Sequence, residues 1–178
     1  MGMMGIDSHR VMGGNIDKRF IEAMIPHHES AVAMAKLARQ KATHPEIKAL
    51  ADSIIASQSA EIKTMRQWHK DWYGTDVSKQ TGITMMGGGM LDSQAEVDSL
   101  NAATDFDKAF LEQMIPHHQM AVMMANMLGQ GTNRPEMQKL AGDILSAQSK
   151  EINQMQTWQT QWGYTSPAQA LGSHTMMH

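Results

Sequence analysis

The sequence predicts an all-α protein, a four-helix bundle built from two repeated helical hairpins. The main observation is a repeat: the segment 24–35, MIPHHESAVAMA, returns at 114–125 as MIPHHQMAVMMA. Around both copies the apolar residues recur at the three- and four-residue spacing of a helix. One hairpin of this size would leave its apolar face exposed, so two hairpins are expected to dock with approximate two-fold symmetry.

Start and stop signals give the helices in order. The first helix is expected to be capped by Asn15 or Asp17 and to kink at Pro26, because its apolar stripe stays in phase across the proline. The alternative is a short helix that ends at the proline and a longer one that follows it. Residues 43–46 have the form of a capping box and open a second helix that ends at Gly74. The second hairpin repeats this pattern.

Composition divides the chain into five segments. The three that connect or flank the hairpins are rich in glycine, serine, threonine and methionine, and the end of the linker has the pattern of a short helix that packs on the bundle. Each repeat could instead stand as its own domain. The segments are a flexible Met/His arm at 1–14, the first hairpin at 15–75, a Met/Gly linker at 76–104, the second hairpin at 105–165 and a Met/His tail at 166–178.

Composition also excludes several classes of function. The chain of 178 residues has no cysteine, which rules out disulfides, thiolate metal sites and thiol catalysis. A formal net charge of −3 provides no basic surface for nucleic acid. No apolar run approaches the roughly 18 residues that a membrane-spanning helix needs, and a signal peptide is expected to have been removed.

Methionine is the unusual feature of the composition, with 19 residues. Methionine fills irregular gaps in apolar cores, and Met34 and Met124 are expected to do so. Many others lie in the arm, linker and tail, where no apolar periodicity indicates a core. Thioethers bind metals without deprotonation and form no disulfides, so this composition favours an oxidising compartment, the periplasm or the cell exterior.

The repeated segment places one thioether and two imidazoles within one turn of helix. An antiparallel hairpin brings a second methionine, from its other helix, to the same height. His69 lies one turn beyond that methionine, where the second repeat has Gln159, so the first site is expected to bind metal more tightly. The candidate metal ligands are Met24, His27, His28, Met65, His69, Met114, His117, His118 and Met155.

This ligand set points to monovalent copper, because thioethers together with imidazole favour Cu(I) among biological metals. An adjacent histidine pair is more often structural, but its repetition beside methionine favours ligation. Glu61 and Glu151 are expected near His27 and His117, where a carboxylate could fix a ring tautomer, pair with lysine or satisfy the kinked backbone.

The arm, linker and tail supply further candidate ligands. We expect these segments to collect ions and to pass them to partly exposed helical sites or to a partner protein. The candidates are Met3, Met4, His9, Met12, Met85, Met86, Met90, His174, Met176, Met177 and His178.

Both copies of Met-Ile-Pro-His-His-x-x-Ala-Val-x-Met-Ala are preceded by Asp-x-x-Phe and followed by a Pro-Glu helix and Met-x-x-Trp. In this layout the sequence resembles the CopM-type copper-binding proteins, a ferritin-like family long catalogued as a domain of unknown function. The resemblance implies a ferritin-like four-helix bundle, binding of Cu(I) and Ag(I) through methionine and histidine, an export signal on the precursor, and a role in copper resistance in the periplasm or outside the cell. The binding role carries over to Met24, His27, His28, Met114, His117 and His118, and more loosely to Met65 and Met155. The lack of a signal and Gln159 are departures.

Three functions remain to be compared. The preferred one is a non-enzymatic copper metallochaperone or sequestration factor that exchanges ions with a copper-export or sensor protein. A ferritin-like metal oxidase would need Glu-x-x-His on two helices, and no glutamate in this chain has a histidine three positions on. A methionine-rich module that binds an apolar partner helix would explain the methionines but not the histidine pairs.

Overall fold

The computed structural model describes residues 8–77 and 93–164, with side chains described for 16–77 and 94–164. These residues form five helices and confirm the predicted all-α fold of two hairpins. The helices are α1 (Ser8–Lys41), α2 (Pro45–Tyr73), α3 (Ser93–Asn101), α4 (Phe106–Gly131) and α5 (Pro135–Gln161).

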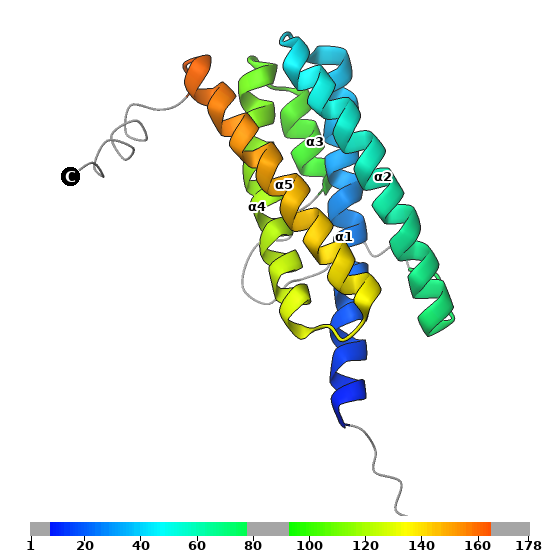
Figure 1. Ribbon diagram of the computed structural model, residues 1–178. Helices are drawn as coiled ribbons and strands as arrows, with labels where there is room; N and C mark the ends of the chain where they lie inside the picture. Colours follow the sequence, from blue (N-terminus) through cyan, green and yellow to red (C-terminus); the bar gives the residue numbers. More distant parts are fainter. Residues whose placement is uncertain (1–7, 78–92, 165–178) are drawn as a thin grey trace, which may run out of the picture.

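The two hairpins dock through their first helices. Helix α1 packs against α2, α4 packs against α5, and α1 and α4 contact each other between the two pairs (Figure 1). Four alanines, two on each of these helices, are fully buried, and side chains this small allow helices to pack closely. They are Ala31, Ala35, Ala121 and Ala125. The short linker helix expected from the sequence is α3, which packs against both α1 and α4.

Helix α1 begins earlier than the sequence predicted and is not divided. It starts at Ser8 rather than at a cap on Asn15 or Asp17, so residues 8–14 belong to this helix and not to a flexible arm. Once a helix has formed, each further residue adds a hydrogen bond at small cost, and a weak helical sequence can extend it. The helix continues through Pro26, which excludes two separate helices at this point.

The turn of the first hairpin is held by the second repeat and not by the predicted capping box at 43–46. His44 is the N-cap of α2, and its side chain makes no capping hydrogen bond. Instead, Asp107 of α4 accepts hydrogen bonds from the backbone N–H groups of Thr43 at 3.0 Å and His44 at 2.9 Å. A carboxylate from the other hairpin therefore satisfies donors that the helix end leaves free.

His44 also lies flat on Trp162, with ring centroids 3.7 Å apart. We call Asp107, His44 and Trp162 the first clasp, because two residues of the second repeat enclose the turn residue of the first. The second clasp has the same arrangement with the repeats exchanged: Arg134 pairs with Asp17 at 3.3 Å and stacks 4.0 Å above Trp72. The clasps hold the hairpins in register at both ends of the bundle.

Candidate metal centre

The histidine pairs of the two repeats meet in the middle of the bundle. His27 and His28 lie on the buried face of α1, and His117 and His118 lie on the buried face of α4. The rings of His27 and His117 stack with their centroids 3.7 Å apart and their planes inclined by 28°. The candidate sites of the two repeats are therefore one continuous centre, which we call the central histidine cluster.

A carboxylate orients one histidine of each pair. His28 Nε2 lies 2.6 Å from Glu61 of α2, and His118 Nε2 lies 2.7 Å from Glu151 of α5. A neutral imidazole donates its Nε2–H to the carboxylate, which leaves the lone pair on Nδ1. In both rings Nδ1 is buried and has no hydrogen-bond partner.

The expectation for these glutamates was therefore half correct. The sequence placed Glu61 and Glu151 beside His27 and His117, but they bond to the following histidine in each case. One position along a helix turns the side chain by about 100°, so a small offset in hairpin register decides which histidine a carboxylate reaches.

The ring nitrogens of the two stacked histidines make no hydrogen bond of normal geometry. Both nitrogens of His27 and both nitrogens of His117 are buried and unpaired. Burial, reinforced by the nearby His28 and His118, lowers the pKa of His27 to about 3. Burial, followed by the charge of His27, likewise lowers the pKa of His117 well below its ordinary value. Both rings are therefore neutral at physiological pH, and each has a lone pair that can bind a metal.

Four of the predicted methionine ligands are buried in the apolar clusters on either side of these histidines. In the first repeat Met24 and Met65 belong to one cluster, and in the second Met114 and Met155 belong to the other. All four are inaccessible to solvent. The expectation of partly exposed sites is therefore wrong for these residues.

A cleft leads from solvent toward the second repeat's glutamate. It has a volume of about 550 Å³, lies between α2 and α5, and includes Leu50, Lys150, Glu151 and Trp158 in its lining. The side chain of Glu151 is 14% exposed, and that of its counterpart Glu61 is 20% exposed. These carboxylates connect the closed centre to the surface.

His69 is not directed at the central histidine cluster. Its Nδ1 donates to the backbone oxygen of Thr75 at 2.7 Å, and its Nε2 lies 3.1 Å from the carboxylate of Glu22. The sequence predicted His69 as a ligand because it lies on the same face of its helix as Met65. In the structure its ring bonds to Thr75 and Glu22 instead. The argument that the first repeat binds metal more tightly through His69 loses its geometric support.

Two polar residues at the same level had no role assigned from the sequence. Gln58 of α2 and Gln148 of α5 are each 3% exposed, and the Oε1 atom of each is buried without a partner. Both interrupt an apolar seam, and both repeats have them. The sequence signal that could have identified these two residues is a polar side chain at the same core position in both repeats.

The remaining candidate ligands cannot be placed. His9 and Met12 lie within α1, but the structure does not describe their side chains. The other candidates lie outside the described residues altogether; they are Met3, Met4, Met85, Met86, Met90, His174, Met176, Met177 and His178.

The donors of the centre fit a soft monovalent ion better than a hard divalent one. Neutral imidazole nitrogens and thioethers dominate, and each nearby carboxylate is already bonded to a histidine. Across 16–77 and 94–164, no three histidine, aspartate or glutamate side chains are arranged to hold an ion. Thioethers and neutral imidazoles are donors that suit Cu(I) or Ag(I).

The fold and this site define an all-α protein with two docked hairpins and a buried methionine and histidine centre. Residues 17–177 match the family described as Domain of unknown function (DUF305), and the chain belongs to this family. This confirms the resemblance found in the sequence. Among the described residues, no helix is long and apolar enough to cross a membrane.

Several relatives have known structures. CopM in its Cu(I)-bound form is 46% identical, with a TM-score of 0.73 over 82% of this chain and 96% of CopM. The Cu(II)-bound form gives 49% identity and a TM-score of 0.75, over 82% of this chain and 97% of that one. CopM has also been solved with silver. Copper and silver, the ions predicted from the sequence, are thus the ions of these related structures.

Other relatives share the fold or part of the sequence. A DUF305 fragment from Deinococcus radiodurans is 28% identical, with a TM-score of 0.69 over 82% of this chain and 96% of that one. The uncharacterized protein L153 of Acanthamoeba polyphaga mimivirus is 45% identical over 49 residues, which are 28% of this chain. That match spans about a third of the length of L153 (32%).

Proposed function

We propose that this protein binds Cu(I) and Ag(I) through methionine and histidine and acts, without catalysis, as a copper metallochaperone or sequestration factor in copper resistance. The observation that carries the proposal is a set of six buried ring nitrogens without hydrogen-bond partners. Leaving buried polar atoms unpaired costs free energy, and metal coordination is one way to recover it. The likeness to copper- and silver-bound CopM supports the same ions.

The proposed ligands are the Nδ1 atoms of His28 and His118, one nitrogen from each stacked ring, and the adjacent thioethers. A metal-binding histidine generally donates its other N–H to a carboxylate, which fixes the tautomer and raises the basicity of the ligand nitrogen. Glu61 and Glu151 are placed to do this. The stack of His27 on His117 makes the two repeats share one centre, so their ions would bind in a coupled manner.

The proposal also includes the compartment in which the protein acts and the way in which it releases its metal ion. A chain without cysteine and rich in thioethers suits the oxidising periplasm or the cell exterior. A buried centre holds its ion against loss, and release to a copper-export or sensor protein would require opening near the exposed edge of Glu61 or Glu151. The alternative of a methionine-rich interaction module would leave the unpaired nitrogens unexplained.

The test is a competition titration of reduced protein with Cu(I) against a chromogenic chelator. The double variant H28Q/H118Q removes both Nδ1 ligands but leaves an amide that can still donate to each glutamate. We expect its Cu(I) affinity to fall by at least about tenfold. The control H69Q changes a buried histidine that also pairs with a glutamate, and it should bind like the parent. Unchanged binding by folded H28Q/H118Q would reject the central site.

A further inference from the structure

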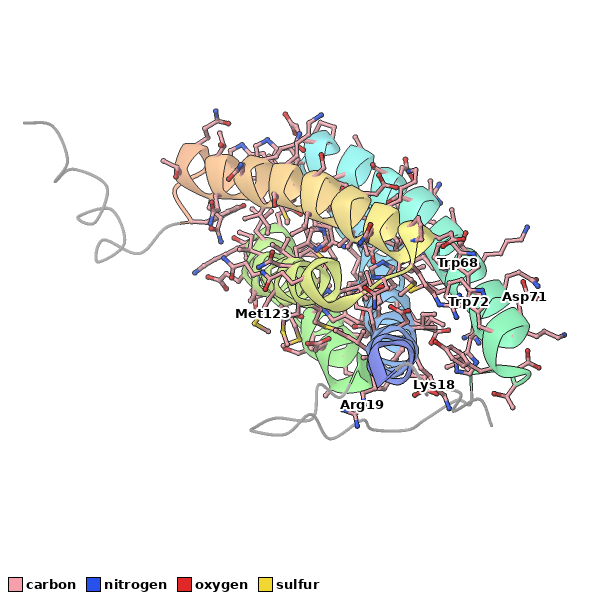
Figure 2. All side chains as sticks on the ribbon, turned by 60° about the horizontal axis from the view of Figure 1, so that its bottom comes forward. Lys18, Arg19, Trp68, Asp71, Trp72 and Met123 are labelled. Carbon is pink, nitrogen blue, oxygen red and sulfur yellow. The ribbon has the colours of Figure 1, made fainter. Side chains whose placement is uncertain are left out.

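Helix α4 carries methionines that the centre does not use. Met123 is 56% exposed and Met127 is 61% exposed, and no other large apolar side chain in the described part of the chain is exposed. Figure 2 shows Met123 on the outer side of α4, on the opposite side of the bundle from Trp68 and Trp72. Exposed thioethers in this position add little to the stability of the core.

Helical spacing places a third thioether on the same face. Met120 is three positions before Met123 and seven before Met127, so the three residues lie in a narrow arc along about two turns of α4. Met120 is half-buried and packs on the core beside them. Side chains one turn apart on a helix have Cβ atoms about 5–6 Å apart, and the flexible methionine chain can bring the sulfur atoms together on one ion.

The corresponding face of α1 is different and is in use. Ser30, Ala33 and Leu37 occupy the equivalent positions. Ser30 is buried and donates a hydrogen bond to Glu96 of α3 at 2.9 Å, and Leu37 packs against the apolar core. Packing therefore accounts for this face in the first repeat but does not account for Met123 and Met127 in the second.

The stretch of α4 that carries these methionines has no charged residue. From Gln119 to Gly131 the helix has no Lys, Arg, Asp or Glu, whereas the equivalent part of α1 includes Glu29, Lys36 and Arg39. A bound cation would meet no repulsion from its own helix. This stretch offers a hard divalent ion no carboxylate, whereas its thioethers suit a soft ion.

We infer that Met120, Met123 and Met127 form a surface site for a soft monovalent ion, Cu(I) or Ag(I). The site shares its ligand with the proposed function but uses none of the residues of the central histidine cluster. It is open to solvent, whereas the central ligands are closed. An ion there can exchange directly with an incoming ligand.

The experiment is an Ag(I) titration of the full-length metal-free chain carrying ¹³C-labelled methionine methyl groups, followed by NMR. Ag(I) is diamagnetic and stable in air. The variant M123L/M127L assigns the two signals and removes two of the three thioethers with little change in volume or helix propensity. The control M34L/M137L removes two buried thioethers that lie in the core.

We expect the methyl signals of Met123 and Met127 to shift on addition of Ag(I), and M123L/M127L to bind about one ion fewer per chain than M34L/M137L. The same shifts should persist in H28Q/H118Q, which separates this site from the central one. If the two signals do not move at saturating Ag(I), or if M123L/M127L binds as many ions as the control, the surface site is rejected. If only the central histidine cluster failed to bind metal, the proposal of the surface site would still stand.

Discussion

The two repeats agree at the centre of the bundle and differ toward its edges. The histidine–glutamate pairs are nearly identical, at 2.6 Å for His28 with Glu61 and 2.7 Å for His118 with Glu151. At the edges the first repeat has His69 and Ala33 where the second has Gln159 and Met123. The difference teaches that the two copies keep the same contacts around the buried histidines. They differ where a side chain has a separate partner, as His69 does, or is exposed to solvent, as Met123 is.

The clasps lie between these two extremes. His44 and Arg134 are different residues, but each is a flat, nitrogen-bearing side chain that stacks on a tryptophan and pairs with an aspartate of the other repeat. The geometry is therefore repeated while the chemistry is not. Three predictions test how equivalent the two repeats are.

The largest expected effect is a loss of stability of the metal-free protein as the pH falls below 6.5. The pKa of His27 drops from 6.5 to about 3 on folding, so below pH 6.5 only the unfolded chain takes up the proton and stability falls. Between about pH 6.5 and 4.5 this costs about 2 kcal/mol for His27, and His117 adds to it. Urea unfolding at a series of pH values between about 6.5 and 4.5 measures this change in the free energy of unfolding.

The matched variant for that experiment is H27Q/H117Q, which removes both stacked rings. It should show a clearly shallower dependence of unfolding free energy on pH, because the remaining groups are the same in both proteins. An equally steep dependence in the variant would mean that these two histidines are not buried in neutral form.

The next largest effect is a difference between the two clasps in how much each aspartate stabilises the fold. Burial raises the pKa of Asp107, but hydrogen bonds from His44 and Thr43 outweigh burial and the net pKa is lowered, so its carboxylate stabilises the fold when ionised. Burial raises the pKa of Asp17, and Thr132 and Arg134 offset this only in part. We expect D107N to lose about 2 kcal/mol of unfolding free energy at pH 7 and D17N about 1 kcal/mol or less. Equal losses would show that the clasps are energetically the same.

The smallest effect concerns the glutamates that orient the histidine ligands. E61Q and E151Q should each weaken Cu(I) binding by about tenfold, equivalent to about 1.4 kcal/mol, because a neutral amide fixes the ring less firmly. The control E22Q alters the partner of His69 and should leave affinity unchanged. Competition titration compares the three. A large difference between E61Q and E151Q would break the two-fold equivalence of the centre.

Much of this architecture could be predicted because its signals are local and periodic. The repeat of Met24 in Met114, the helical spacing around each copy and the proline near the start of α2 identify two similar hairpins. The burial of Met34 and Met124 followed from the same spacing. The contact of each central glutamate with a histidine followed from counting residues about the turn, although this counting selected the wrong histidine of the pair.

Other features depend on contacts between distant parts of the chain. Asp107 replaces the predicted cap because it reaches the first hairpin's turn from the other repeat. His69 turns away from the centre because Thr75 and Glu22 provide partners that helix spacing does not reveal. Asp17 lies inside a helix and pairs with Arg134, although its residue type is typical of a cap.

The sequence by itself determined the all-α fold, the duplicated hairpin and the residue types of the centre, since these depend on spacing along single helices. Only the tertiary structure decided that His27 stacks on His117, that the centre is closed, and that Met123 and Met127 remain at the surface. The physical reason is that helical periodicity fixes the face on which a side chain lies. Which other helix covers that face is set by the docking of the two hairpins.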